Sequence, residues 1–461
     1  MFSLIDRIQK QVERQSLDYW SLRFDSNKSL SIKAENGSIE ELNDGIIEGL
    51  SLRVLVKGNY GFAFSNNFKN FDSENFVLKA VKSAVLLPAR KKVKLPNQKP
   101  VKKKLKVKEK KLFSSLSLEQ KSLKLKKLSL LPLKLDSSLK QSRIILVENK
   151  TEKTLINSFG SQLQQTIPRT LLNVFVTGKK QENLQGKRAS KANVGGLEIA
   201  FNDNSNSFVE NTAKTVLQLL DSKPLKSENA SIIVDPELSD VFAHEAIGHA
   251  MELDAVNSHA SVLRGMLGKK ICSSKINLVD EPNAKGFGQT FFDDEGTQSR
   301  KVFLIRNGVL KEYLNNLELA GALGFKPTGH ARAQAFNFQP IIRMTNTFFE
   351  KGKTSYSDLL ETTRNGLLLK GFNGGQVDPA TGTFMFGIEQ AFKIVKGEVK
   401  ESFTGASISG NIKTFLTKID LLSNKVGEFN PGFCGKEGQS VPVSGGGPFI
   451  KLSDVRVSGR K

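Results

Sequence analysis

The chain has 461 residues, of which 38% are hydrophobic, enough for two or three domains with cores of their own. No apolar run approaches the roughly 18 residues that a membrane-spanning helix needs, and two cysteines cannot build a disulfide framework. The first residues lack the pattern of a secretory signal peptide, so we expect a cytoplasmic protein that does not engage a membrane.

The net charge of +22 is concentrated in one segment. Residues 90–140 hold 18 Lys or Arg against three acidic residues, a net charge of +15. Such a run favours a solvated surface segment or a contact with an acidic partner. It also permits electrostatic binding of nucleic acid, but Phe113 is the only aromatic residue in this segment, which argues against base stacking.

Turn signals between alternating apolar runs predict an N-terminal α/β domain over residues 1–87 that is rich in hairpins. After an N-terminal helix, Asn36-Gly37 and Lys57-Gly58 each separate two strand-like runs. Residues 76–87 have helical spacing. The lysine-rich residues 88–112, with three prolines, predict a linker or surface loop.

A central domain is predicted over residues 113–224. Its first element is a short basic helix over 116–131. Asn149-Lys150 lies between two apolar runs and predicts a hairpin turn. A strand over 171–176 and a helix over 211–220 complete this part of the chain.

A C-terminal domain is predicted over residues 225–461, and it opens with a strand over 230–234. Asp235-Pro236 is a good helix start, with Asp as N-cap and Pro in the first turn. Further hairpins are expected at Asn307-Gly308 and Lys396-Gly397. The whole chain therefore predicts an α+β fold, in which a hairpin-rich N-terminal α/β region precedes a C-terminal domain of mixed sheets and helices.

The helix after Asp235 carries residues 244–249, with the sequence HEAIGH, which contain two of the four histidines and a glutamate. Imidazoles are common metal ligands, and an adjacent carboxylate can activate a metal-bound water. Five residues turn an α-helix by about 500°, so the two histidines would point about 140° apart. A local π-bulge would bring them together, and a helix break at Gly248 is the alternative.

Two histidines are too few for a catalytic zinc, which usually takes three protein ligands and leaves a position for water. Glu252 lies three residues after His249 and could reach the same side. Cys434, between two nearby glycines, offers a thiolate from far along the chain. Spacing alone leaves both residues open as the third ligand.

The motif resembles the H-E-x-x-x-H helix of the TldD/PmbA metallopeptidase family, and four further blocks resemble this family in the same order. They are residues 292–297, 343–347, 374–379 and 434–442. The resemblance is closest over residues 230–461 and looser before them. It does not extend to the lysine-rich stretch.

The resemblance implies a C-terminal metallopeptidase domain that binds one zinc ion through His244, His249 and Cys434. It makes Glu245 the catalytic base that activates the zinc-bound water, and Glu252 a residue that supports the ligands. Because every ligand is retained, the chain resembles the catalytic, TldD-like member of the family. Such members hydrolyse unfolded or extended peptides, and they imply a dimer with a related PmbA/TldE-like subunit or a homodimer.

Other polar residues could serve the site or have only a structural role. His330 and Arg343 are candidates to contact substrate or support the site, and a structural role is the alternative for each. The acidic residues 293–295 more often cap a turn or form salt bridges than bind a cation. A different class of function also stays open, a nucleic-acid-associated regulatory protein that uses residues 90–140 and has a structural metal site.

Overall fold

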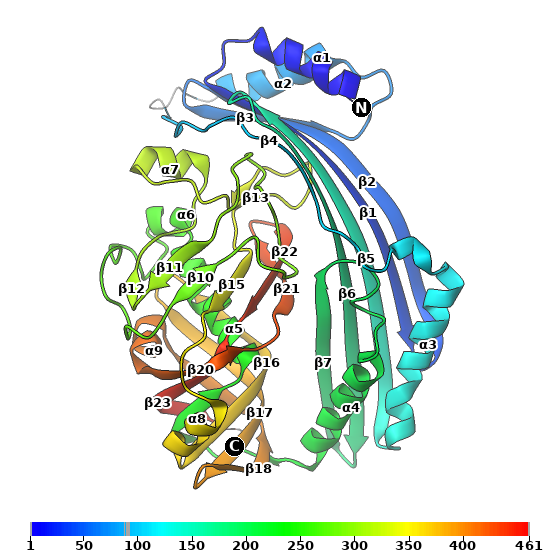
Figure 1. Cartoon of the computed structure of the whole chain (residues 1–461), viewed down its shortest axis with the longest axis vertical. Coiled ribbons are helices and arrows are strands. Elements are labelled where there is room, and N and C mark those ends of the chain that lie inside the picture. Colours follow the sequence, from blue (N-terminus) through cyan, green and yellow to red (C-terminus); the bar gives the residue numbers. More distant parts are fainter. Residues whose placement is uncertain (1, 87, 89–92, 460–461) are drawn as a thin grey trace.

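The computed structural model describes residues 2–86, 88 and 93–459 of the chain. The protein has the α+β fold that the sequence predicted, with several separate sheets. Figure 1 shows a long curved sheet from the N-terminal half beside a second body of sheets and helices from the C-terminal half. Among the described residues, no helix is both long enough and apolar enough to cross a membrane.

The N-terminal half forms one seven-stranded sheet in the order β3-β2-β1-β5-β6-β4, with β7 also paired to β6. The predicted turns at Asn36-Gly37 and Lys57-Gly58 are confirmed, and all four residues have the positive φ that tight hairpin turns require. The strands are β1 (Tyr19–Glu35), β2 (Ser38–Val56), β3 (Asn59–Ser65), β4 (Lys102–Lys106), β5 (Leu139–Asn157), β6 (Gln162–Lys180) and β7 (Asn183–Val194).

Helices cover one face of this sheet because apolar side chains alternate along its strands. In β1, Leu22 and Ile32 point toward the helices and belong to two apolar cores. Arg23 and Asp25 point to the opposite face and are buried there. The elements of the covered face are α1 (Phe2–Glu13), α2 (Ser73–Val85), the 3-10 turn η1 (Phe113–Ser115), α3 (Leu118–Leu135) and α4 (Ser205–Asp221).

The predicted hairpin at Asn149-Lys150 is wrong. Strand β5 passes straight through both residues, and Asn149 pairs with Ser29 of β1 on one side and Arg169 of β6 on the other. β5 lies inside the sheet, so its backbone groups are satisfied by two neighbours, and this pairing overrides the local preference of Asn for a turn.

Residues 88–112 are not entirely a linker or loop, because residues 102–106 form β4 and pair in parallel with β6. Residues 89–92 of this segment, and residue 87 at the end of the predicted helix, lie outside the described residues. The expected division between residues 1–87 and 113–224 does not separate two sheets, since β1 pairs with both β2 and β5.

The C-terminal half contains a six-stranded sheet, β12-β11-β10-β15-β22-β21, the pair β13-β14 and a larger sheet. In the larger sheet the pairings β16-β9-β23-β19-β17-β16 close a ring, while β8, β18 and β20 extend it. The first strands are β8 (Lys223–Pro224), β9 (Glu228–Val234), β10 (Leu278–Asp280), β11 (Val302–Arg306), β12 (Val309–Leu310), β13 (Ala331–Arg332), β14 (Ile341–Ile342) and β15 (Asn346–Phe349). The others are β16 (Gly366–Asp378), β17 (Thr383–Val395), β18 (Glu398–Thr404), β19 (Ala406–Asn411), β20 (Ile419–Val426), β21 (Asn430–Lys436), β22 (Gln439–Gly446) and β23 (Pro448–Ser458).

Short helices accompany these sheets. Both predicted hairpins are confirmed, between β11 and β12 and between β17 and β18. The helices are α5 (Pro236–Val241), α6 (Leu253–Asn257), α7 (Leu317–Leu323), α8 (Tyr356–Thr363) and α9 (Ile412–Lys418). Helix α5 lies between the six-stranded sheet and the larger sheet, in contact with strands of both. The π-helical turn η2 (Phe242–Gly248) and the 3-10 turn η3 (His249–Met251) follow α5 directly.

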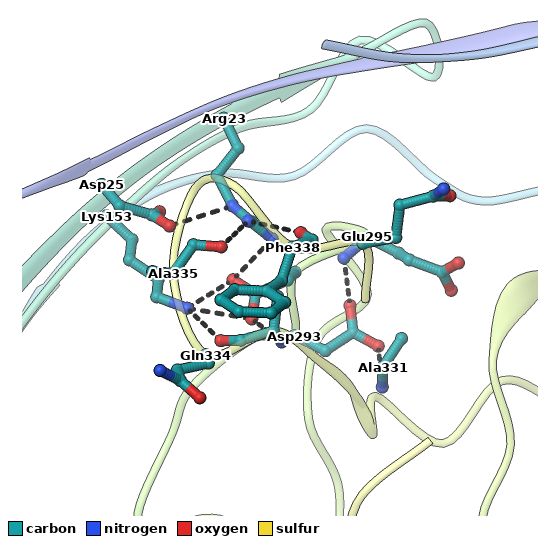
Figure 2. Close-up of polar contacts among 12 residues, drawn as sticks. Arg23, Asp25, Lys153, Asp293, Glu295, Ala331, Gln334, Ala335 and Phe338 are labelled. Carbon is teal, nitrogen blue, oxygen red and sulfur yellow. Dashed lines mark hydrogen bonds and ion pairs between the residues drawn. The ribbon is translucent and has the colours of Figure 1, made fainter. Parts of the chain in front are cut away.

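The polar face of the curved sheet is tied to loops of the C-terminal half (Figure 2). Lys153 of β5 donates to both carboxylate oxygens of Asp294, at 2.7 and 2.9 Å, and Arg23 lies 3.6 Å from the same carboxylate. Arg53 of β2 forms a buried ion pair with Glu295. Asp293 accepts hydrogen bonds from three backbone N–H groups, which shape its loop. Residues 293–295 therefore form the salt bridges and turn contacts that the plainer interpretation predicted.

Candidate metal centre

The helix that carries the two histidines begins as the sequence predicted. Asp235 caps it by accepting a hydrogen bond from the backbone N–H of Leu238 at 3.0 Å, and Pro236 occupies the first turn. After one turn of α5 the backbone widens into η2, where the N–H of His249 bonds to the carbonyl of His244. A bond between residues five apart defines a π-turn, so the predicted π-bulge is confirmed.

The π-turn brings the two imidazoles to one side of the helix. The ring centroids of His244 and His249 lie 5.2 Å apart, with the ring planes at 89°. Phe242, at the start of η2, anchors the turn by stacking on Phe415 at 3.8 Å between centroids. Gly248 allows close packing here, because a Cβ would overlap the sulfur of Met344 and approach the carbonyl oxygen of Ala243 to 3.0 Å. The distortion is therefore part of the packed core.

Cys434, on β21, completes a group of three metal-binding side chains. Its Sγ lies 3.5 Å from Nε2 of His249, and one ligand atom from each of His244, His249 and Cys434 lies within 4.8 Å of the others. Nitrogen and sulfur donors at this separation match the preference of zinc. Cys434 and His244 are buried, and His249 is half-buried.

The electrostatics of the group favour a thiolate. Burial alone would raise the pKa of Cys434, but hydrogen bonds with His244 and His249 outweigh burial and lower the pKa to about 5. Burial lowers the pKa of His249, yet the adjacent carboxylate of Glu252 and the thiol of Cys434 raise it well above its usual value. The sulfur is thus poised in the ionised form that binds metals.

Glu252 lies beside the group but not within it. Its Oε2 is 3.0 Å from Nδ1 of His249, which leaves Nε2 of that imidazole directed at Cys434. Lys436 donates to Glu252 at 3.1 Å and to Asp254 at 2.6 Å. A carboxylate on the second nitrogen of a ligating imidazole fixes the ring and its tautomer.

Glu245 is the most exposed side chain of the motif. Its side chain is 47% exposed, and Oε2 lies 3.8 Å from Nε2 of His249. The carboxylate is therefore accessible to solvent while it stays close to the metal-binding group. This is the geometry that a general base needs.

Arg343 and His330 are placed differently from each other. The buried guanidinium of Arg343 donates to the carbonyl of Cys434 and, at 3.3 Å, to that of Gln439, so it braces the β21–β22 hairpin. His330 is fully buried, with Nε2 2.9 Å from Asp280 and Nδ1 3.0 Å from the carbonyl of Thr328. Both nitrogens are occupied inside the protein, so substrate contact by His330 is not supported.

Asp240 is a site residue that sequence reasoning missed. Burial raises its pKa to about 7, and the neighbouring His244 acts in the opposite direction. The signal was present in the sequence, because Asp240 precedes His244 by four residues on a predicted helix and so shares its face. Each histidine of the group thus has a carboxylate near it.

Comparison with known proteins gives two family matches. The model of the PmbA/TldA metallopeptidase C-terminal domain matches residues 227–459, and the model of domain 1 of the same metallopeptidase matches residues 20–86. A metalloprotease of Methanothermobacter thermautotrophicus is 33% identical over 443 residues, which cover 96% of each chain. A zinc metalloprotease TldD homolog of Saccharolobus solfataricus is 36% identical over 55% of this chain and 57% of its own.

Solved structures share the fold. The crystal structure of TldE from Thermococcus kodakarensis superposes with a TM-score of 0.80 at 22% identity, covering 100% of both chains. A crystal structure of a Thermotoga maritima protein gives 0.82 at 19% identity, covering 99% of this chain and 100% of its own. At these identities the likeness concerns the fold alone.

Proposed function

Because this chain belongs to the PmbA/TldA metallopeptidase family, we propose that it is a zinc-dependent peptidase that hydrolyses unfolded or extended peptides. The observation that carries the proposal is the convergence of His244, His249 and Cys434, whose ligand atoms lie within 4.8 Å of one another. Relatives that are named metalloproteases along almost their whole length support the same class of activity.

The three side chains would hold one zinc ion per chain. Two imidazoles and a thiolate are ligands that zinc favours, and three protein ligands leave room for water and substrate. When bound, the metal would lower the pKa of a water molecule and polarise the peptide carbonyl. Glu252 would orient the His249 ring through their 3.0 Å contact, and Arg343 would hold the backbone of Cys434.

Glu245 would move the proton. Its half-exposed carboxylate would accept a proton from the attacking water and then deliver it to the nitrogen of the departing peptide. A peptide must reach this carboxylate in an extended form, since the ligands themselves are largely buried.

We also propose that this chain is the catalytic, TldD-like subunit and that it dimerises, either with a related PmbA/TldE-like chain or with a second copy. The complete ligand group supports the catalytic assignment. The structural likeness to TldE supports a common architecture for two related subunits. Mixing this chain with a co-expressed relative and measuring the mass of the assembly distinguishes the two kinds of dimer.

Zinc quantification combined with peptide cleavage tests the mechanism. Glu245→Gln keeps the shape of the side chain but removes the base, so we expect about one zinc per chain and a cleavage rate lower by roughly 100-fold or more. Cys434→Ser should lose both zinc and cleavage. Glu401→Gln, an exposed glutamate on β18, is the matched control and should behave as wild type. Full cleavage by Glu245→Gln would exclude Glu245 as the base.

A further inference from the structure

A small cavity of about 70 Å³ lies where the polar face of the curved sheet meets the C-terminal half. Its walls carry three cations, Lys153 of β5, Arg169 of β6 and Arg332 of β13. Asp294 is the one acidic side chain among the described residues that line it. The neutral polar residues of its walls are Thr151, Gln165, Thr290 and Gln334.

Among the described residues, neither arginine of this cavity forms an ion pair, although Asp294 and Asp280 act on Arg332 from a longer distance. Arg169 donates to the carbonyls of Phe287 and Gln289, at 2.8 and 2.7 Å, and Arg332 donates to those of Met344 and Pro442. Within the described part of the chain, no carboxylate lies within the 4.0 Å of an ion pair from either guanidinium. Both side chains are more than nine-tenths buried. A buried charge without a counter-ion is costly, which favours an anion brought by a ligand.

Asp294 balances these arginines only in part, because it acts on Arg332 from beyond ion-pair distance and is contacted more closely by other cations. Lys153 donates to both of its oxygens, Arg23 lies 3.6 Å away, and the backbone N–H of Ala333 adds a bond at 2.7 Å. Figure 2 shows Lys153 and Arg23 converging on this loop from the curved sheet. Burial and the like charge of Arg332 lower the pKa of Arg169 to about 9. This direction is expected for a buried guanidinium that has no carboxylate beside it.

The cavity lies next to the metal-binding group. Val441 and Pro442 of β22 form part of its wall, and Val441 pairs directly with Cys434 on β21. Neighbouring strands are about 4.8 Å apart, and an extended peptide advances about 3.3 Å per residue. The cavity therefore lies within the reach of a few residues of an extended peptide from the metal-binding group.

We propose that this cavity, the carboxylate pocket, binds a carboxylate of the peptide substrate through Arg169 and Arg332. The inference rests on the proposed peptidase function and deepens it, because it selects peptides that carry a carboxylate a few residues from the scissile bond. A carboxylate is small and planar, and it accepts paired hydrogen bonds from guanidinium groups. It comes either from the C-terminus of the peptide or from a Glu or Asp side chain.

Direct binding tests the pocket without relying on hydrolysis. The protein is zinc-loaded Glu245→Gln, and the probe is an alanine hexapeptide with an N-terminal fluorophore, as the free acid or as the C-terminal amide. We expect the acid to bind about ten-fold more tightly in fluorescence anisotropy. Two further amidated peptides, ending in Glu or in Gln, separate the sources, since a gain with Glu identifies a side-chain carboxylate.

Variants connect the preference to the arginines. Adding Arg169→Met should remove the preference by weakening only the carboxylate-bearing peptides, and unchanged binding of the amide reports an intact fold. Arg306→Met, which removes an exposed arginine on β11, is the matched control and should keep the full preference. Equal binding of all four peptides overturns the proposal. So does a preference that survives both Arg169→Met and Arg332→Met.

The outcome for the pocket is separate from that for the proposed function. If peptides with a carboxylate bind preferentially but wild type cleaves none of them, the carboxylate pocket is supported and the peptidase function is contradicted. If acid and amide peptides are cleaved at equal rates and bound with equal affinity, the peptidase function is supported and the carboxylate pocket is contradicted.

Discussion

His249 takes part in two contacts that define its role, one through each ring nitrogen. Nε2 faces Cys434 at 3.5 Å, and Nδ1 faces Glu252 at 3.0 Å. The second contact chooses which nitrogen remains available as a ligand, because a ring nitrogen that holds a proton for a carboxylate cannot bind a metal. The buried carboxylate of Glu252 therefore acts on the metal through the imidazole.

Glu252→Gln should weaken zinc binding by about 10- to 100-fold, because the amide holds the imidazole less firmly and lowers its basicity. Competition with a chromogenic chelator measures the affinity. Asp254→Asn is a close control, since Asp254 also accepts a bond from Lys436 but has no contact with His249 among those described. If both variants bind zinc as tightly as wild type, Glu252 does not support the ligand.

The residues of the motif could be predicted from local physics, whereas the remote ligand could not. The i, i+5 spacing required either a π-bulge or a helix break at Gly248, and η2 is a π-helical turn. Cys434 lies 185 residues from His249, so nothing in the spacing chose it over Glu252. The family resemblance made that choice, and the geometry agrees with it. Asp240 is absent from the predicted site, although it lies about one helical turn before His244.

At the scale of the element, η2 is a π-helical widening that packs against the surrounding core. Gly248 packs under Met344, and Phe242 is surrounded by Phe384, Phe386 and Phe415. An α-helix would satisfy the backbone equally well but would turn the two imidazoles apart. The aromatic contacts and the missing side chain at position 248 thus select the π-turn.

Gly248→Ala should displace the turn, because a Cβ at this position overlaps the Met344 sulfur. We expect a free energy of unfolding lower by about 1–3 kcal/mol and a weaker zinc affinity, measured by chemical denaturation and chelator competition. Gly435→Ala is the matched control, next to a ligand but with open space around the added carbon. A Gly248→Ala protein with unchanged zinc affinity would mean that the ligand geometry does not depend on this packing.

Turns and strands could be predicted from the sequence where the local preference of the residues agreed with the strand pairing of the folded chain. The Asn36-Gly37 turn could be predicted because a tight hairpin turn requires positive φ, which Asn and Gly tolerate best. The strands on either side also alternate apolar and polar residues. Asn149 offered the same type of signal inside β5, where pairing on both sides overrode it. A single sequence does not show which strands lie inside a sheet, so it does not show where turn signals are overridden.

At the scale of the whole molecule, buried charges join the curved sheet to the C-terminal half. The ion pair of Arg53 and Glu295 is at most 7% exposed, and the second oxygen of Glu295 accepts a bond from the N–H of Leu317 at 2.8 Å. One carboxylate therefore connects β2 with the start of α7. Residues 1–87 and 113–224 contribute strands to one sheet, and these contacts link that sheet to the metal-binding half.

Arg53→Met should lower the free energy of unfolding by about 3–5 kcal/mol, because it leaves Glu295 as an uncompensated buried charge. Lys180→Met is the matched control. It removes an exposed ion pair with Asp221, for which we expect a change of about 1 kcal/mol or less. Thermal and urea denaturation measure both variants, and equal stability of the two would show that the buried pair does not hold the halves together.

The lysines of β4 stand at an edge of the curved sheet, where none of the described strands pairs with the free side of β4. An open edge offers free N–H and C=O groups to any other strand and so promotes aggregation, and exposed lysines oppose it by repulsion. Four of the five residues of β4 are lysines, and all four are exposed. These four lysines belong to the basic segment that raised the possibility of nucleic-acid binding. In the folded chain we expect their repulsion to keep the sheets of different copies from pairing edge to edge in concentrated solution.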